Sequence, residues 1–216
     1  MIVNENITKY IHSLAVSGPD YLEKIRSCAE KNEVPVIRRE MEPFIKVLFR
    51  MNKPRKILEI GTAVGYSALF FESLAPEAEI ITIENYEPRL KEARKNFEGH
   101  KNITLLEGDA VKLIKNIEGG FDFVFLDAAK GQYIQMLPDI SGLLKVGGML
   151  LADNCLQDGD IVKSRFAAER RQRTIHERMR EFIWQVCHDE CFETSLVPIG
   201  DGVTLSIKIQ DGKNDR

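Results

Sequence analysis

From Arg55 onward the sequence alternates short apolar runs with helical segments, and this alternation constrains the fold more than any other feature. Such segments build βα units, in which each helix returns the chain so that successive strands lie parallel in one sheet. Two predicted strands are almost continuously apolar, as expected where helices cover both faces of a sheet. The predicted parallel strands span residues 56–60, 79–84, 103–106, 121–126 and 148–152.

The end of the chain predicts a different strand arrangement. Residues 195–199 and 203–209 are separated only by Gly200-Asp-Gly202, which has the turn chemistry of a β-hairpin and requires antiparallel pairing. Before the sheet, helices are predicted over residues 4–16, 20–32 and 40–51. We therefore expect an α/β, Rossmann-like fold with a mostly parallel seven-stranded sheet that ends in an antiparallel hairpin. It should form one domain, with an N-terminal helical cap at 1–52 and a sheet core at 53–210.

Composition and charge exclude several classes of protein. The apolar runs are well short of the ~18 residues that a membrane helix needs. The first residues carry acid where a secretory signal would carry Lys or Arg, so we expect a cytoplasmic protein without a membrane partner. The net charge of −3 argues against a protein that coats nucleic acid with its whole surface, but it allows a local basic patch.

A glycine motif, Glu59-Ile-Gly61-Thr-Ala-Val-Gly65-Tyr-Ser67, follows the first predicted strand. Its glycines permit a tight turn and a close approach of a ligand to the backbone at the carboxyl edge of the sheet. The G-x-x-x-G spacing differs from that of dinucleotide folds, and no P-loop lysine is present, so pyrophosphate binding is disfavoured. Taken alone, such glycines more often serve only to pack a helix on a strand.

Two further strand ends carry groups that suit a nucleoside. Glu84 ends the second strand, where this topology places a carboxylate that accepts hydrogen bonds from ribose hydroxyls. Gly108-Asp109-Ala110 follows the third strand, where a carboxylate and adjacent backbone groups could bind an adenine amino edge. Three neighbouring strand ends thus indicate one cofactor crevice.

The fourth and fifth strand ends predict a metal site. Asp127 ends one strand and Asp153-Asn154 the next, so two carboxylates and an amide oxygen should meet at one point. Such hard oxygen ligands suit Mg²⁺ or Mn²⁺. The alternative is that Asp127 caps a helix and Asp153-Asn154 forms a turn. Lys130 is close enough to be a general base or to stabilise an oxyanion, although a lone lysine can also be a solvated surface residue.

Together, the segments E-I-G-T-A-V-G-Y-S, I-E, G-D-A and L-D-A-A-K-G-Q-Y resemble the motifs of the metal-dependent O-methyltransferases related to the catechol and caffeoyl-CoA enzymes. The resemblance covers nearly the whole chain. It implies a class I methyltransferase fold, S-adenosyl-L-methionine as the cofactor, Mg²⁺ or Mn²⁺ as the metal, and a homodimer. By motif, the cofactor residues would be Ile37, Glu59, Gly61, Ser67, Glu84, Gly108, Asp109 and Asp127, the metal ligands Asp127, Asp153 and Asn154, and the catalytic residues Lys130 and Asp127.

The resemblance leaves two acceptors open. The combination of Val34-Pro35, the 127–133 segment, Asp153-Asn154 and the 198–202 segment is most similar to bacterial tRNA 5-hydroxyuridine methyltransferases, which make 5-methoxyuridine at the anticodon wobble position. A 5-hydroxyuracil has its 5-hydroxyl beside its 4-carbonyl oxygen, so it can chelate one ion as a catechol does. The other acceptor is a small catechol or phenylpropanoid, which requires the same cofactor and metal residues.

A basic segment bears on this choice. Residues 161–180 contain seven Lys or Arg against two Glu, and phosphate contacts from them would bind the tRNA anticodon region. The alternative is an amphipathic helix with a solvated basic face, and the two are compatible. A non-catalytic RNA-binding module is a third hypothesis, and the intact acids at 127 and 153 count against it. The candidate tRNA contacts are Lys163, Arg165, Arg170, Arg171 and Arg173.

Overall fold

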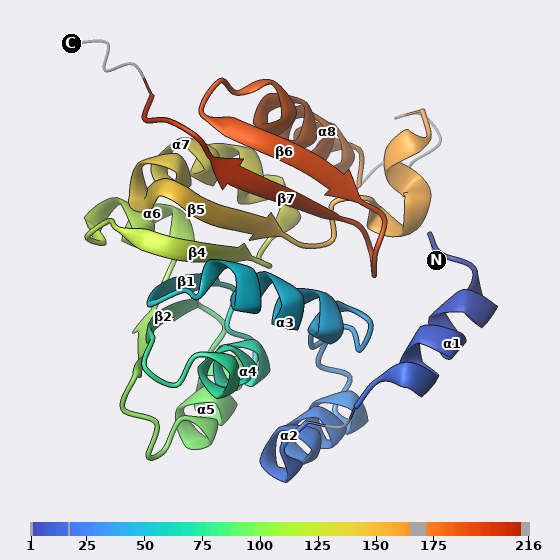
Figure 1. Ribbon diagram of the computed structural model, residues 1–216, viewed down its shortest axis with the longest axis vertical. Coiled ribbons are helices and arrows are strands. Elements are labelled where there is room, and N and C mark those ends of the chain that lie inside the picture. Colours follow the sequence, from blue (N-terminus) through green and yellow to red (C-terminus); the bar gives the residue numbers. More distant parts are fainter. Residues whose placement is uncertain (1, 17, 165–171, 213–216) are drawn as a thin grey trace.

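The computed structural model describes residues 2–16, 18–164 and 172–212. It contains a seven-stranded sheet with the strand order β3-β2-β1-β4-β5-β7-β6 (Figure 1). Strands β1 to β5 pair in parallel, while β7 is antiparallel to both β5 and β6, as the sequence predicts. The strands are β1 (Lys56–Ile60), β2 (Glu79–Glu84), β3 (Ile103–Glu107), β4 (Phe121–Leu126), β5 (Leu144–Ala152), β6 (Phe192–Val197) and β7 (Val203–Lys208).

Helices precede the sheet and connect its strands. The three predicted N-terminal helices are present as α1 (Glu5–Leu14), α2 (Asp20–Lys31) and α3 (Met41–Asn52). The connecting α-helices are α4 (Tyr66–Leu74), α5 (Glu87–Asn96), α6 (Ala110–Leu113), α7 (Tyr133–Leu143) and α8 (Arg173–His188). Three short 3₁₀ turns, η1 (Ile114–Asn116), η2 (Lys130–Gln132) and η3 (Gln157–Val162), complete the connections.

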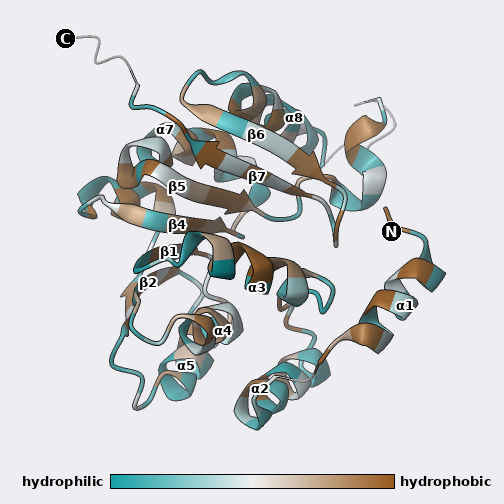
Figure 2. Ribbon diagram, in the orientation of Figure 1, coloured by the Kyte–Doolittle hydropathy of each residue, from teal (hydrophilic) through white to brown (hydrophobic). Residues whose placement is uncertain are grey.

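The sheet is covered on both faces, which explains its apolar strands. Successive side chains of a strand point to opposite faces. Phe123 and Phe125 therefore pack with α2, α3 and α4, whereas Val124 and Leu126 pack with α7 and α8. Figure 2 shows the resulting apolar positions along the central strands. Two buried layers thus hold the central strands rigidly, and their carboxyl ends share one edge.

β3 and β7 differ from their predicted bounds by one residue, and β5 and β6 differ by more. β6 ends at Val197 because Pro198 has no N–H to donate to the sheet, and it begins earlier than predicted, at the buried Phe192. β5 begins at Leu144 rather than at Gly148. A positive φ of 85° at Gly147 and a register shift against β4 let the strand continue across the glycine pair.

The N-terminal helix α1 lies apart from the sheet (Figure 1). Its apolar side chains are largely uncovered, with Ile7 53%, Tyr10 66% and Leu14 64% exposed. A hydrogen bond between His12 Nε2 and Glu40 Oε2, at 2.7 Å, connects α1 to the turn before α3. Among the described residues, no helix has the length and apolar character needed to cross a membrane.

Candidate active site

The carboxyl ends of β1, β2, β4 and β5 meet at one edge of the sheet because their registers align. Ile60 is opposite both Ile83 and Leu126, and Leu126 is opposite Ala152. The sheet hydrogen bonds continue one residue further: the Asp127 amide donates to the Ile60 carbonyl at 2.9 Å, and the Asp153 amide to the Leu126 carbonyl at 2.9 Å. The two aspartates therefore lie side by side, as the sequence predicts.

Gly61 makes this close packing of strand ends possible. Its φ is +112°, and a Cβ atom there would lie 1.9 Å from the Asp127 carbonyl oxygen. No other residue fits without displacing the backbone that carries Asp127. The packing of the strand ends at the site therefore requires a glycine at position 61, in addition to any role of this glycine in packing a helix on a strand.

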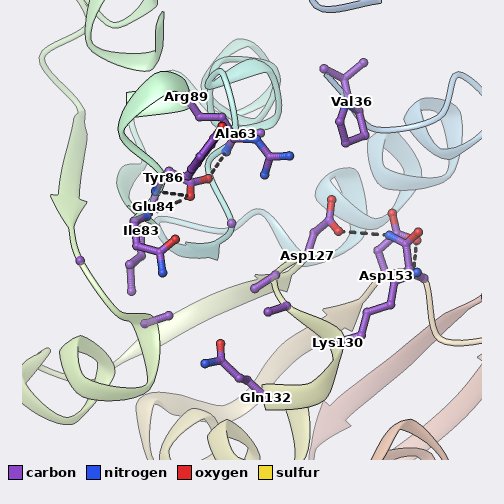
Figure 3. A pocket seen from close by; sticks show the side chains of 18 of the residues that line it. Val36, Ala63, Ile83, Glu84, Tyr86, Arg89, Asp127, Lys130, Gln132 and Asp153 are labelled. Carbon is purple, nitrogen blue, oxygen red and sulfur yellow. Dashed lines mark hydrogen bonds between the residues drawn. The ribbon is translucent and has the colours of Figure 1, made fainter. Parts of the chain in front are cut away.

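A cavity of about 540 Å³ lies over these strand ends. Figure 3 shows Glu84, Tyr86 and Arg89 at one end, with Asp127, Asp153 and Lys130 at the other. Gly61, Gly108 and Asn154 also line it, so that seven residues predicted from sequence reach one cavity. These seven are Gly61, Glu84, Gly108, Asp127, Lys130, Asp153 and Asn154.

Glu84 is buried and anchored by backbone amides. Its Oε2 accepts a hydrogen bond from the Ala63 amide at 2.9 Å, and its Oε1 accepts from the Asn85 and Tyr86 amides at 2.9 and 3.0 Å. These bonds fix the carboxylate between the loop after β1 and the end of β2. Each oxygen retains capacity to accept a further hydrogen bond from a hydroxyl in the cavity.

Asp127 and Asp153 form a pair of neighbouring acids at the ends of β4 and β5. Burial raises the pKa of both carboxyls, and the charge of Asp127 raises that of Asp153 further. Lys130 and a hydrogen bond from Asn154 Nδ2 to Asp127 Oδ1, at 3.1 Å, partly oppose the rise at Asp127. Like charges held this close favour the protonated forms, and a cation between them would reverse that preference.

The donor set fits a hard divalent cation. Asp127 and Asp153 provide carboxylate oxygens, and Asn154 provides an amide oxygen once the amide turns to replace its nitrogen. Within the described part of the chain, no cluster of three or more His, Cys, Asp or Glu is arranged to hold a metal. A cation here would therefore rely on two carboxylates and an amide, with solvent or acceptor oxygens completing its shell.

A second hollow of about 300 Å³ adjoins the cavity, and Lys130 lines both. Its other lining residues are Gln157, Asp158, Asp160, Gln172, Ile175, His176 and Asp201. Lys130 Nζ is 3.9 Å from Asp201 Oδ2, and Arg38 Nη2 is 4.0 Å from the same oxygen. The buried Asp201 thus lies between two cations, and most of the residues that line the hollow have polar or charged side chains.

Four residues predicted to bind the cofactor lie beside the cavity lining rather than on it. Ile37 is buried between two lining residues, Val36 and Arg38. Ser67 and Glu59 are buried under the loop after β1, and Asp109 accepts a hydrogen bond from the Val111 amide at 3.0 Å as the N-cap of α6. Their roles toward a cofactor stay predictions.

Several lining residues were missed from the sequence. Arg38 and Arg89 come from the segment before α3 and from α5, where nothing in the local sequence distinguishes them from solvated arginines. Asp201 did carry a signal, since it lies in the P-I-G-D-G motif of the hairpin turn. The turn brings it to the same edge as β5 because β7 pairs with β5.

The predicted tRNA contacts are only partly described. Lys163 is exposed and pairs with Asp160 at 2.6 Å, and Arg173 begins α8. Arg165, Arg170 and Arg171 lie outside the described residues. Helix α8 is amphipathic: it buries Met179, Phe182 and His176, while Ile175 is 40% exposed.

Comparison with known proteins agrees with this geometry. A family model described as O-methyltransferase matches residues 12–209. A caffeoyl-CoA O-methyltransferase from Petroselinum crispum is 30% identical over 225 residues, covering 97% of this chain and 93% of the relative.

Two crystal structures share the fold closely. One, from Staphylococcus aureus and provisionally described as a caffeoyl-CoA O-methyltransferase, has a TM-score of 0.88 at 31% identity, covering 94% of this chain and all of that one. The S-adenosylhomocysteine-bound methyltransferase of Podospora anserina has a TM-score of 0.84 at 26% identity, covering 95% and 97%. The sheet and its helices therefore form a Rossmann-like methyltransferase fold, and the chain belongs to the O-methyltransferase family.

Proposed function

We propose that this protein transfers a methyl group from S-adenosylmethionine to one of two vicinal oxygens on a small aromatic acceptor, with the help of a divalent cation. The observation that carries the proposal is one cavity with Glu84 and the glycines predicted to bind a nucleoside at one end, and a pair of acids with a lysine at the other. The caffeoyl-CoA O-methyltransferases among its relatives support an acceptor of the catechol type.

The cofactor would lie along the sheet edge. Glu84 would accept the ribose hydroxyls, Gly61 would allow the closest backbone approach, and Gly108 would contact the adenine end. The reactive methyl group would then face Asp127. Ile37, Glu59, Ser67 and Asp109 would support these contacts from just behind the lining.

The acceptor would lie where the cavity meets the second hollow. Asp127, Asp153 and Asn154 would hold the cation, which when bound favours the deprotonated acceptor hydroxyl at neutral pH. Lys130 borders both spaces, so its amine can receive the hydroxyl proton or its ammonium can stabilise the oxyanion. The strand ends fix these groups, and transfer requires only that the oxygen align behind the methyl carbon.

The metal proposal is tested by replacing each acid. Asp127→Ala and Asp153→Ala should abolish methyl transfer to a catechol and weaken Mn²⁺ binding measured directly by calorimetry, because each removes a carboxylate donor. Glu118→Ala, an exposed acid outside the cavity, is the control and should change neither. Full wild-type turnover in excess chelator would overturn the role of the cation.

A second candidate acceptor is 5-hydroxyuridine in the tRNA anticodon, making the protein a tRNA-modifying enzyme. The second hollow favours it, because seven of its eight lining side chains are polar and only Ile175 is apolar. These side chains can pair with the hydrogen-bonding edges of a pyrimidine. Arg178 on the adjoining helix α8 donates to the Gly131 carbonyl at 3.1 Å, which places a basic helix beside the hollow.

Two measurements separate the acceptors. The purified enzyme should be assayed with free catechols and with tRNA that contains 5-hydroxyuridine, at matched concentrations. In parallel, tRNA nucleosides from cells that lack the protein should be analysed by mass spectrometry. Loss of 5-methoxyuridine with accumulation of 5-hydroxyuridine would establish the tRNA acceptor, whereas an unchanged nucleoside profile with efficient catechol methylation would establish the small molecule.

A further inference from the structure

A buried polar network joins the N-terminal helices to the glycine motif. Arg26 of α2, Glu42 of α3 and Tyr66 of α4 are all buried and mutually bonded. Arg26 forms a short ion pair with Glu42, and the Tyr66 hydroxyl donates to the same Glu42 oxygen at 2.6 Å. The Arg26 guanidinium also lies over the Tyr66 ring, 4.4 Å from its centroid.

The network reaches one further partner, the backbone of the segment 35–38. Arg26 Nη2 donates to the Ile37 carbonyl at 2.9 Å. This segment connects α2 to α3 without helix or strand of its own, and its Pro35, Val36 and Arg38 line the cavity. One buried guanidinium thus fixes the middle of a cavity wall that has no regular secondary structure to hold it.

The arrangement is poorly suited to stability alone. Arg26 is only 2% exposed, and its Nε is buried without a hydrogen-bond partner in the described chain. A buried donor without a partner destabilises the folded state, and buried ion pairs are often no more stable than apolar side chains of the same volume. What the arginine does achieve is geometric, because it bonds Glu42 and the Ile37 carbonyl at once.

We propose that Arg26 is a positioning residue: it holds the 35–38 segment in the shape that closes the cavity around the cofactor. The inference rests on the proposed function, since it assumes that S-adenosylmethionine occupies this cavity. Tyr66 acts through the same carboxylate, that of Glu42. Because Tyr66 directly follows Gly65, this hydrogen bond connects the 35–38 segment to the glycine loop after β1, which would approach the cofactor from the other side of the cavity.

The test uses S-adenosylhomocysteine binding by calorimetry on the full chain. Arg26→Lys keeps the charge but lacks the guanidinium whose Nη2 donates to both Glu42 and the Ile37 carbonyl, so the Kd should rise by about tenfold, the effect of losing one buried hydrogen bond. Tyr66→Phe should raise it less, in the same direction. In turnover assays, the KM for S-adenosylmethionine should change more than kcat, because the reacting groups remain in place.

Arg39→Lys is the matched control. Arg39 follows this segment directly and pairs with Glu23 of the same helix α2, with contacts of 3.3 and 3.0 Å, but it is partly exposed and does not line the cavity. Melting temperatures of all variants are measured alongside. Arg39→Lys should leave the Kd unchanged even if its melting temperature falls as far as that of Tyr66→Phe.

The outcomes are distinguishable. A wild-type protein that fails to bind S-adenosylhomocysteine would overturn the proposed function and this inference with it. Wild-type binding together with an unchanged Kd in folded Arg26→Lys would overturn the positioning role alone, as would an equal loss of affinity in Arg39→Lys. If Arg26→Lys does not fold, the Kd of Tyr66→Phe decides, and a wild-type value refutes the proposal.

Discussion

At the scale of single residues, Glu59 couples the stability of the fold to pH. It is fully buried on β1, where burial raises the pKa of its carboxyl from 4.5 to about 7, while the Ser67 and Thr82 hydroxyls hold it partly down. The folded state therefore binds this proton more tightly than the unfolded state. The resulting stabilisation is complete below pH 4.5 and is lost as the pH rises through 7.

We predict that Glu59→Gln removes this dependence. The shift corresponds to about 3 kcal/mol between pH 4.5 and 7. The free energy of unfolding of the variant, relative to wild type, should thus increase by about that amount from pH 4.5 to 8 in urea melts. Subtracting the wild-type free energy of unfolding from that of the variant removes the contribution of the other titrating groups, which both proteins share. A constant difference across this range would show that Glu59 has an ordinary pKa in the folded protein.

Residues at strand ends were predictable because strand geometry alone places them. A short apolar strand followed by Asp or Glu fixes the carboxylate at the edge, which is how Glu84, Asp127 and Asp153 were found. Arg38 and Arg89 were not predictable, because long side chains reach the cavity from segments whose path depends on tertiary packing. Asp109 differs from them, because its carboxylate caps the N-terminus of α6 just after β3.

At the scale of elements, a buried lysine supports the end of α7. Lys208 of β7 donates to the carbonyls of Ser141 and Leu144, at 2.8 and 2.9 Å, where the helix ends and β5 begins. The last carbonyls of a helix have no partner within the helix, so this ammonium satisfies groups that would otherwise be buried unpaired. The hairpin is thereby tied to the helix layer as well as to β5.

We predict that Lys208→Met destabilises the protein by about 1–3 kcal/mol, because two carbonyls lose a charged donor. The free energy of unfolding is measured by urea denaturation, and affinity for S-adenosylhomocysteine should not change. Lys145→Met, which removes an exposed ion pair with Asp122, is the control and should cost less than about 1 kcal/mol. Equal losses in the two variants would contradict a specific role for Lys208.

The presence of each helix and strand could be predicted from the periodicity of apolar residues, but the ends of some of them could not. β1, β2 and β4 were predicted with their observed bounds. The limits of β5 and β6 depend on a glycine bulge and on a proline, whose effects appear only once the neighbouring strand is in place. Hairpin pairing was predictable because the turn is too short for a parallel crossover.

At the scale of the whole molecule, the exposed apolar face of α1 leads us to predict that the protein self-associates. Its apolar face projects from the body, and its exposed Ile7, Tyr10 and Leu14 recur at helical spacing (Figure 2). A second copy of the chain could cover this face. Light scattering should then give a dimer for the wild type and a monomer for the double variant Ile7→Glu, Leu14→Glu. A wild-type monomer at tens of micromolar would contradict the prediction.

The basic segment provides the decisive test of the tRNA acceptor at this scale, because a stem is larger than the cavity and must contact the surface around it. If Arg170, Arg171 and Arg173 bind phosphates, changing all three to Glu should weaken tRNA binding strongly while S-adenosylhomocysteine affinity stays nearly constant. Each lost contact should also reduce the slope of log K against log salt by roughly 0.7 to 0.9, because fewer counterions are released.

The control makes the same change in charge elsewhere. Lys101, Lys112 and Lys115 are exposed residues around β3 and α6, and their replacement by Glu alters the net charge equally. A general electrostatic effect would weaken tRNA binding in both triple variants, whereas specific contacts would affect only the arginine variant. Wild-type tRNA affinity and salt slope in the arginine variant, together with efficient methylation of free catechols, would refute tRNA as the acceptor and leave the small aromatic molecule.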